Sequence, residues 1–265
     1  MPESTPLNGG DVYVSPRYLA GLPGHGDPSF DPVAHWPRYS LDEGECQLVI
    51  ASPDHRIKIG WFGDGYDVWQ ISASKDAVSA PTWTARINQN TPPELVHGLT
   101  SALAEAYDAG GEAFLKSTSY RWTDGVQPLL EAGWERMPLA AGFVNIVAPD
   151  NLAGATIDVV RSGSDAETWT LWAGPPGWGT RAEIVFTART PKHLIAATAA
   201  GFLDPAPVVR EKRYLDRQLA QLATLTPTAP VPATSTRKPV GTQSPAPKSI
   251  PGPAAIPASP GGRRH

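Results

Sequence analysis

One succession of motifs occurs twice in this chain of 265 residues, with the second copy 96 to 100 positions after the first. Each copy contains a Pro-Asp pair, a tryptophan in an alternating run and a Thr-Pro pair before an apolar stripe. The matched features are Pro53-Asp54 and Pro149-Asp150, Trp69 and Trp169, Thr91-Pro92 and Thr190-Pro191, and, upstream, segments 31–36 and 127–134. Because a fixed order of motifs at one spacing is typical of repeated units, the sequence predicts an internal duplication.

Each unit is predicted to contain a turn followed by a β-meander. Asp after Pro favours a turn, because its carboxylate accepts hydrogen bonds from nearby backbone N–H groups. Pro53, Asp54, Pro149 and Asp150 are therefore the predicted structural turn residues. The runs that follow alternate between apolar and polar residues, which predicts strands with one buried face. That face comprises Ile57, Ile59, Trp61, Trp69, Ile71, Ala73, Trp83, Ala85 and Ile87, then Ile157, Val159, Trp169, Leu171, Ala182, Ile184, Phe186 and Ala188.

A helix is predicted to close each unit. Thr91 is the expected N-cap of the first helix, Pro92 its first residue, and Glu94 the partner in a capping box. Thr190 is the expected N-cap of the second helix, where His193 replaces the glutamate. The predicted apolar stripes are Leu95, Val96, Leu99 and Leu103, then Leu194, Ile195, Thr198 and Phe202.

The expected fold class is α+β, with two duplicated units in a pseudo-two-fold arrangement. Each unit would be an antiparallel meander of three to four strands followed by a packing helix. A last helix is expected because Leu215, Leu219 and Leu222 share one helical face. The expected divisions are an N-terminal segment 1–30, a first unit 31–110, a connector 111–126, a second unit 127–208, a C-terminal helix 209–225 and a tail 226–265.

Composition limits the classes of protein that fit. The tail is mostly Pro, Ala, Ser and Thr, which predicts disorder, and it is basic, whereas the rest of the chain is acidic. Cys46 is the only cysteine, which excludes an intramolecular disulfide. The histidines lack metal-binding spacing, so no metal and no cofactor are expected. No apolar run approaches the roughly 20 residues that cross a bilayer, and no secretory signal is visible. A cytoplasmic protein without a membrane partner is expected.

Several spaced segments together resemble one family. They are "VSPRYLAG", "SPDHRIKIGW", "DVWQISA", "PTWTA", "TPPELV" and "FLDPAPVVR". They resemble an actinobacterial domain-of-unknown-function family named for a Ser-Pro-Asp-Tyr motif and often present as tandem copies. The resemblance covers roughly residues 13–210. The chain departs from the motif with His55 in place of Tyr and with Ala148-Pro149-Asp150-Asn151 in the second unit. The resemblance implies the tandem architecture and no established activity.

Two outward-facing sets of residues are candidate contact surfaces. Arg56, Lys58 and Arg86 form a basic set that would meet nucleic-acid phosphates, with the basic tail adding a salt-dependent attraction. The second set is Val160, Trp172 and Val185, an apolar patch that would bind another protein or a second copy of the chain. The leading hypothesis is therefore a non-enzymatic binding or adaptor protein, associated with nucleic acid or, alternatively, with protein.

An enzyme with a site between the two units is the third alternative. It would use Asp54, His55 and Asp150, and it requires these side chains to meet in one pocket, because a general base needs a partner within hydrogen-bond reach. Asn151 replaces the histidine in the second unit, which favours a structural role for the motif. No catalytic residue is assigned, and the sequence leaves the partner and the oligomeric state open.

Overall fold

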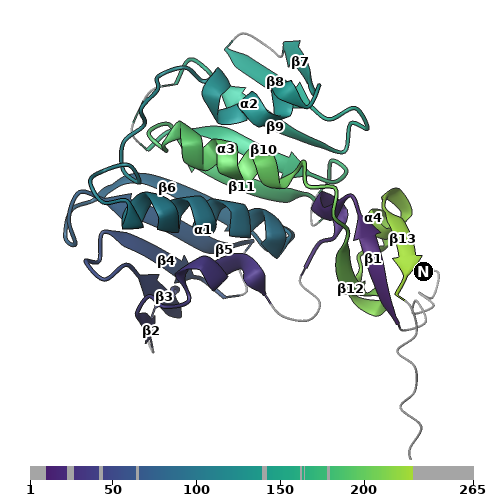
Figure 1. Cartoon of the computed structure of the whole chain (residues 1–265), viewed down its shortest axis with the longest axis horizontal. Coiled ribbons are helices and arrows are strands. Elements are labelled where there is room, and N and C mark those ends of the chain that lie inside the picture. The colour runs from purple at the N-terminus through teal and green to yellow at the C-terminus, as the bar shows by residue number, and fades with distance from the viewer. Residues whose placement is uncertain are drawn as a thin grey trace, which may run out of the picture. The chain divides into compact units, whose positions relative to one another are not determined.

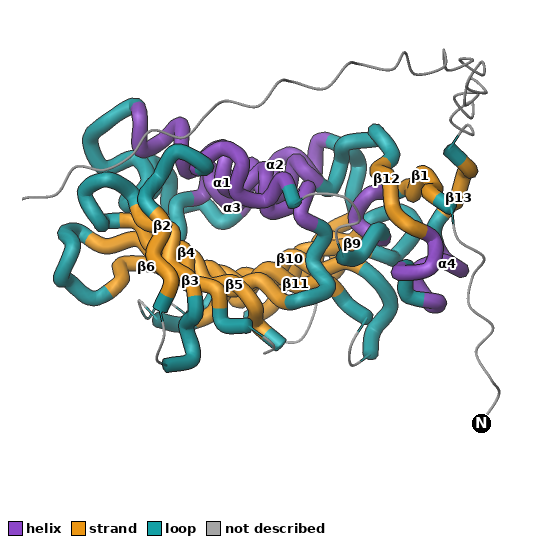
Figure 2. The backbone as a smooth tube through the Cα atoms, turned by 90° about the horizontal axis from the view of Figure 1, so that it is seen from below, coloured by secondary structure: helices purple, strands orange, loops and turns teal. Residues whose placement is uncertain are grey.

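Most of the protein is a single large sheet with helices packed on one of its faces (Figure 1). The computed structural model describes residues 10–22, 27–41, 44–63, 66–138, 142–161, 163, 165–177 and 180–228. In the view of Figure 2 the helices lie on one side and the strands on the other, so these elements form two layers. The fold is mixed α+β with antiparallel sheets, as the alternating runs and capped stripes predicted.

The large sheet contains ten strands in the order β2-β3-β4-β5-β6-β11-β10-β9-β8-β7. Its first half is β2 (Arg38–Ser40), β3 (Leu48–Ala51), β4 (Ile57–Trp61), β5 (Asp67–Ser74) and β6 (Pro81–Asn88). Its second half is β7 (Glu135–Pro138), β8 (Phe143–Val147), β9 (Ala153–Asp158), β10 (Glu167–Ala173) and β11 (Ala182–Thr187). Each half is a five-stranded meander, one or two strands longer than predicted. The short edge strands β2 and β7 carry too little alternation to be recognised in sequence.

Three α-helices and a 3-10 helix cover one face of this sheet. They are α1 (Pro93–Asp108), α2 (Thr123–Glu131), α3 (Lys192–Gly201) and η2 (Pro28–Val33). α1 packs against η2 and α3, and α3 also packs against α2. Both predicted apolar stripes are buried under these contacts, which confirms the two closing helices.

The core lies between the helices and the sheet, and it continues across both halves. Ile71 pairs with Ala85, Ala85 with Phe186 and Phe186 with Trp169, so one apolar row passes from the first half into the second. These side chains belong to one buried cluster. The predicted buried face is therefore confirmed in its main part. Val159 is an exception, because it follows the end of β9 and is 42% exposed.

The two halves join edge to edge where β6 pairs with β11. Only three residue pairs form this seam, and Arg86 opposite Val185 is the central one. Side chains extend the seam at both ends: the amide N–H of Glu183 donates to Asn88 Oδ1 at 3.1 Å, and that of Thr84 donates to Thr187 Oγ1 at 2.9 Å. These bonds satisfy backbone groups that the short ladder leaves unpaired.

A second, three-stranded sheet is built from both ends of the described chain. β1 (Asp11–Ser15) pairs with β12 (Val208–Glu211) on one side and with β13 (Thr224–Pro227) on the other. The prediction of one helix over 209–225 is therefore wrong for most of that range; only α4 (Arg217–Leu222) is an α-helix, preceded by the 3-10 helix η3 (Lys212–Tyr214). A further 3-10 helix, η1 (Arg17–Leu19), follows β1.

The boundary of the predicted tail also shifts. Thr226 and Pro227 belong to β13, and the backbone N–H of Thr228 donates to the carbonyl oxygen of Asp11. The remaining tail, from 229 onward, lies outside the described residues. The helical spacing of the leucines misled the prediction. The Val208-Val209-Arg210 run alternates between buried and exposed residues, and Val208 packs in a small apolar cluster with Val14 of β1.

The predicted helix caps are also incorrect. α1 and α3 are preceded by Pro92 and Pro191, and neither helix has a side-chain cap. The hydroxyl of Thr91 bonds instead to Asn88 Oδ1 and to the carbonyl oxygen of Glu183. Glu94 turns away from the predicted capping box toward Arg210. The local sequence assigns both residues to capping, but Glu94 forms an ion pair with a distant residue and Thr91 bonds across the seam.

Candidate functional site

The two Pro-Asp turns have the same backbone geometry. The amide of His55 donates to the Ser52 carbonyl at 2.8 Å, and that of Asn151 donates to the Ala148 carbonyl at 2.9 Å. His55 and Asn151 both have φ of 60°, in the left-handed region. Each aspartate accepts a bond from the amide two residues on, at 3.1 Å for Asp54 and 2.9 Å for Asp150. These contacts support the predicted role as turn residues.

The two aspartates do not converge on one site. Ile57, which follows the first turn, pairs through Ala73 with Trp83 near the start of β6. Ala153, which follows the second turn, pairs through Ala173 with Ala182 at the start of β11. β6 and β11 are antiparallel, so their starts lie at opposite ends of the sheet. The predicted enzyme site built from Asp54, His55 and Asp150 is therefore wrong.

Local contacts shift the pKa values of two groups at the turns, Asp54 and Tyr18. Burial raises the pKa of Asp54, but hydrogen bonds from the Ser52 hydroxyl, the Arg56 amide and Tyr107 outweigh it and leave the pKa lowered. The Tyr18 hydroxyl donates to Asp150 Oδ2 at 2.5 Å, and burial together with this bond raises the pKa of Tyr18. The lowered pKa of Asp54 is the opposite of the raised pKa expected of a general acid at neutral pH.

The three cations proposed to meet nucleic acid are engaged within the protein. The Arg56 guanidinium lies 4.7 Å from the Phe114 ring centroid and 3.9 Å from Glu112. Lys58 Nζ donates to the carbonyl oxygen of Ala77 at 3.0 Å.

Arg86 is held between two acidic side chains, Asp67 at 3.5 Å and Glu167. Lys58 and Arg86 share the open face of the sheet, with Ser72 of β5 opposite Lys58 and Gln70 of β5 opposite Arg86. Among the described residues, Arg56 and Arg86 meet carboxylates and Lys58 meets only a neutral carbonyl, so the predicted basic set offers one uncompensated charge to phosphates.

Trp172 is not available as a contact residue, which contradicts its predicted place in an apolar patch. It is 6% exposed, and its ring lies over Gly154, where an added Cβ would approach to 2.5 Å. Its Nε1 donates to Thr156 Oγ1 at 3.2 Å, and the Arg181 guanidinium covers the ring at 4.1 Å. Of the other two patch residues, Val160 is 72% exposed and Val185 is half-buried.

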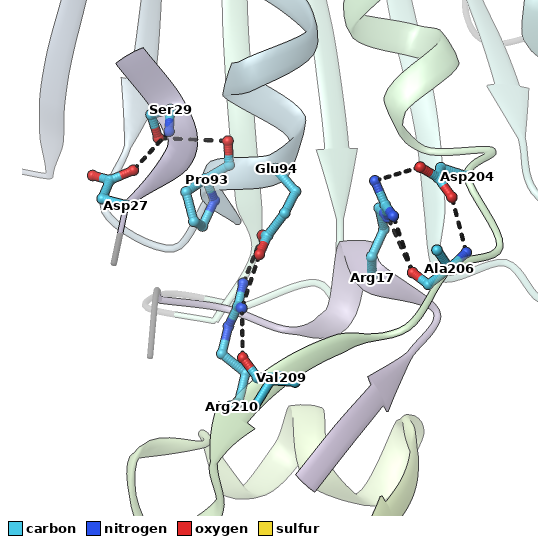
Figure 3. Close-up of polar contacts among 9 residues, drawn as sticks. All are labelled: Arg17, Asp27, Ser29, Pro93, Glu94, Asp204, Ala206, Val209 and Arg210. Atoms are coloured by element: carbon cyan, nitrogen blue, oxygen red, sulfur yellow. Dashed lines mark hydrogen bonds and ion pairs between the residues drawn. The ribbon is translucent and has the colours of Figure 1, made fainter. Parts of the chain in front are cut away.

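A cavity of about 460 Å³ near the start of α1 contains an ion pair between two of its lining residues, Glu94 and Arg210. Arg210 reaches from β12 to Glu94, with bonds of 2.9 and 2.6 Å to the two carboxylate oxygens (Figure 3). Asp27 accepts the Ser29 amide at 2.9 Å. The Glu94 and Arg210 charges neutralise each other, and their ion pair links β12 of the small sheet to α1.

A second cavity, of about 580 Å³, lies at the start of α3, and we name it the α3 cavity. It is bounded by the segment after α1, the end of β9, the start of β10 and the first residue of α3. Its lining includes Leu115, Trp122, Ile157, Thr168, Trp169, Arg189, Thr190 and Lys192. The Ser117 hydroxyl accepts the Lys192 amide at 3.2 Å and donates to the Ser119 carbonyl, which fixes this segment against α3.

Lys192 is the central cation of the α3 cavity. Its Nζ donates long hydrogen bonds to the carbonyl oxygens of Ala188 at 3.3 Å and Thr190 at 3.4 Å, and it lies 4.8 Å from the Trp169 ring centroid. Burial lowers its pKa to about 8. No carboxylate in the described part of the chain lies within ion-pair distance of Lys192 or of Arg189.

Two threonine hydroxyls of the cavity lining have no partner among the described residues. Thr190 is fully buried and Thr168 is 5% exposed, and Oγ1 of each makes no hydrogen bond. Thr168 is the extra residue of a bulge between Glu167 and Trp169, which lets consecutive residues line the same cavity. Buried hydroxyls are usually satisfied, so two unsatisfied ones in one lining point to a missing hydrogen-bonding group.

Comparison with protein families supports the resemblance over part of the chain. Residues 51–109 match the model of SPDY, a domain of unknown function (DUF317). This stretch runs from the end of β3 through α1 and includes the first Pro-Asp turn. No curated protein and no solved structure matches the chain.

Neither a metal cluster nor a membrane-spanning helix occurs among the described residues. They contain no cluster of three or more His, Cys, Asp or Glu side chains suited to a metal ion. None of their helices has the length and apolarity needed to cross a bilayer. The α3 cavity is therefore the candidate site, and the sequence analysis missed it. The available signal was the run Arg189-Thr190-Pro191-Lys192, which stands where the first half has Asn90-Thr91-Pro92-Pro93.

Proposed function

We propose that this is a binding protein whose ligand occupies the α3 cavity. The observation that carries the proposal is the set of unsatisfied polar groups around one cavity: Lys192 and Arg189 without carboxylates, and Thr168 and Thr190 without hydrogen bonds. Leaving the two buried hydroxyls unpaired costs about 1–3 kcal/mol each. A cavity of about 580 Å³ is within the usual size of small-molecule sites.

We also propose that the chain arose by internal duplication, as a tandem pair of the SPDY-type unit. In support, the central pair of the seam joins Arg86 to Val185, two residues 99 positions apart. The helices touch at a pair with the same spacing, because a Cβ on Gly98 would lie 3.0 Å from the Ala197 carbonyl oxygen. A two-fold axis between equivalent units would produce both coincidences.

The two hydrogen bonds that extend the seam correspond to each other when each residue is matched to the one 99 positions away. Asn88 receives the amide of Glu183, and Thr187 receives the amide of Thr84. Asn88 and Thr187 differ by 99 positions, as do Thr84 and Glu183. The polar groups of the α3 cavity do not follow this pattern, since Pro93 and Asn90 stand where the second half has Lys192 and Arg189. On this proposal the binding site belongs to one copy.

The test is a titration with two fluorescent dyes, anilinonaphthalene sulfonate and its uncharged parent phenylnaphthylamine. At least one dye should bind the folded protein in a saturable, one-to-one manner. Val159→Trp should abolish that binding, because Val159 lines the cavity at an exposed position where a bulky ring obstructs it. Val160→Trp is the matched control, since Val160 is the exposed neighbour outside the lining. Equal binding by both variants, or no binding to the wild type, would contradict the proposal.

A further inference from the structure

We infer that the ligand of the α3 cavity is an organic anion, with an apolar or aromatic body and an oxyanion group held by Lys192 and Arg189. This inference rests on the proposed function and specifies the class of ligand. It requires a positive end with unused donors, an apolar wall beside that end, and no carboxylate in the lining that would neutralise the positive end. The lining of the cavity meets these three conditions, since its carboxylate, Asp158, is paired with Arg161.

The positive end has donors available. A lysine ammonium carries three N–H groups, and Lys192 uses two of them in long bonds to backbone carbonyls. Arg189 is exposed, and its guanidinium makes no ion pair among the described residues. Phosphate, sulfonate and carboxylate oxygens accept bonds from both of these groups.

The other charges around the cavity are already paired. Asp158 accepts the amides of Val160 and Arg161, both at 3.0 Å, and pairs with the Arg161 guanidinium at 3.3 Å. Lys116 pairs with Glu112, one helical turn away. Tyr120 is fully exposed at the rim. Because these charges are already paired, Lys192 and Arg189 supply the charge that faces a ligand.

The apolar wall begins directly at the ammonium group. Lys192 Nζ lies 4.8 Å from the Trp169 ring centroid, and Ile157, Leu115 and Trp122 continue the lining. A ligand whose oxyanion meets Lys192 therefore places its adjoining body against aromatic and aliphatic side chains. A bare inorganic ion would leave that wall in contact with water, so an organic anion fits the cavity better.

The two dyes of the previous test differ only in the sulfonate, so their affinities measure the contribution of charge. Anilinonaphthalene sulfonate should bind the full chain about tenfold or more tightly than phenylnaphthylamine, as expected for one charge-assisted hydrogen bond. Lys192→Gln should bring the two affinities close together, whereas Lys58→Gln, the same change at an exposed position outside the cavity, should not. Inorganic phosphate at high concentration should displace the sulfonate dye alone.

A second pair of variants covers the case in which Lys192→Gln fails to fold. Arg189→Gln changes an exposed side chain at the cavity, and Arg38→Gln makes the same change on the edge strand β2. Only Arg189→Gln should weaken binding of the sulfonate dye. Binding should also weaken as pH rises through about 8, where Lys192 loses its proton, and Lys192→Gln should remove this dependence.

The outcomes separate the two proposals. If both dyes bind equally and Lys192→Gln and Arg189→Gln change neither affinity, the cavity binds ligands without selecting charge, and only the anion inference is overturned. If neither dye binds the wild type, the proposed function and this inference both fall. A preference for the sulfonate that disappears in Lys192→Gln and persists in Lys58→Gln supports both.

Discussion

The starts of α1 and α3 occupy corresponding places in the two halves of the sheet, yet the charged side chain at the first is paired with a counter-ion (the closed junction) and the one at the second is not (the open junction). At the start of α1, Glu94 is neutralised by Arg210 (Figure 3). The ring centroids of Phe30 and Trp69 lie 4.3 Å apart. At the start of α3, Lys192 has no counter-ion and faces a cavity. The comparison teaches that one backbone frame supports either a packed junction or a site, depending on a few side chains.

Side-chain size explains part of the difference. Trp61 of the first half stands where the second half has Ile157, and Phe30 stands where it has Val126, each 96 positions later. Smaller residues leave space beside Trp169 that aromatic rings fill beside Trp69. Removing ring volume without collapse of the backbone produces a cavity.

The largest predicted effect is on the closed junction. Glu94→Ala should lower the free energy of unfolding by about 3–5 kcal/mol, because it leaves the Arg210 guanidinium, 5% exposed, buried without a carboxylate. Urea unfolding measures the loss. The matched control is His193→Ala at the equivalent position of α3, where an exposed side chain should change stability by less than about 0.5 kcal/mol. Equal losses would mean that the two helix starts do not differ as described.

The second prediction concerns the seam that joins the halves. Asn88→Ala should cost about 2–3 kcal/mol, because it removes the partners of the Glu183 amide and the Arg181 carbonyl. Thr187→Val keeps the shape of the side chain and removes its bonds with the amide and the carbonyl of Thr84, so it should cost about 1–2 kcal/mol. Chemical denaturation of both variants gives the ranking. A larger loss for Thr187→Val would show that the two ends of the seam are not held as the contacts indicate.

The sequence predicted those parts of the fold that depend on neighbours in the chain. Alternation identified the buried face, and the stripes identified α1 and α3, because each pattern lies within a few residues. The capping box failed because the partner of Glu94 is Arg210, 116 positions away. The seam and the small sheet escaped prediction for the same reason, since alternation gives the face of a strand and not its neighbour.

The candidate site was visible in the sequence only as a difference between the two aligned halves. Lys192 and Arg189 replace Pro93 and Asn90, and this substitution introduces two cations at one place. That they lie beside a cavity depends on the connector after α1, which carries no recognisable motif. The difference between the two halves also favoured Trp172 as a contact residue, and this prediction is wrong because the Trp172 ring is covered by Arg181.

The third prediction concerns the open junction and has the opposite sign from the first. Lys192→Met should raise the free energy of unfolding near neutral pH by about 1–2 kcal/mol, with the value discounted for the partly exposed ammonium. The folded protein holds the Lys192 pKa near 8, below its usual 10.5, so the unfolded state binds the extra proton between these values. The free energy of unfolding of the wild type therefore rises relative to that of Lys192→Met between about pH 8 and pH 10.5, and the difference between the two proteins should be smaller at pH 10.5. A gap that stays constant with pH would show that the Lys192 charge is not its cause.

The smallest predicted effect tests whether the two Pro-Asp turns are interchangeable. His55 and Asn151 share a φ of 60°, a conformation that asparagine adopts more readily than most other residues. His55→Asn should therefore raise stability by up to about 0.5 kcal/mol, and the reciprocal Asn151→His should lower it by a similar amount. Precise urea midpoints of the two variants are sufficient to detect this. If His55→Asn lowered stability instead, the contact of the His55 ring with Tyr39, at 5.8 Å, would outweigh the backbone preference. The histidine of the first turn would then be retained for packing, and the shared turn geometry would not make the two residues exchangeable.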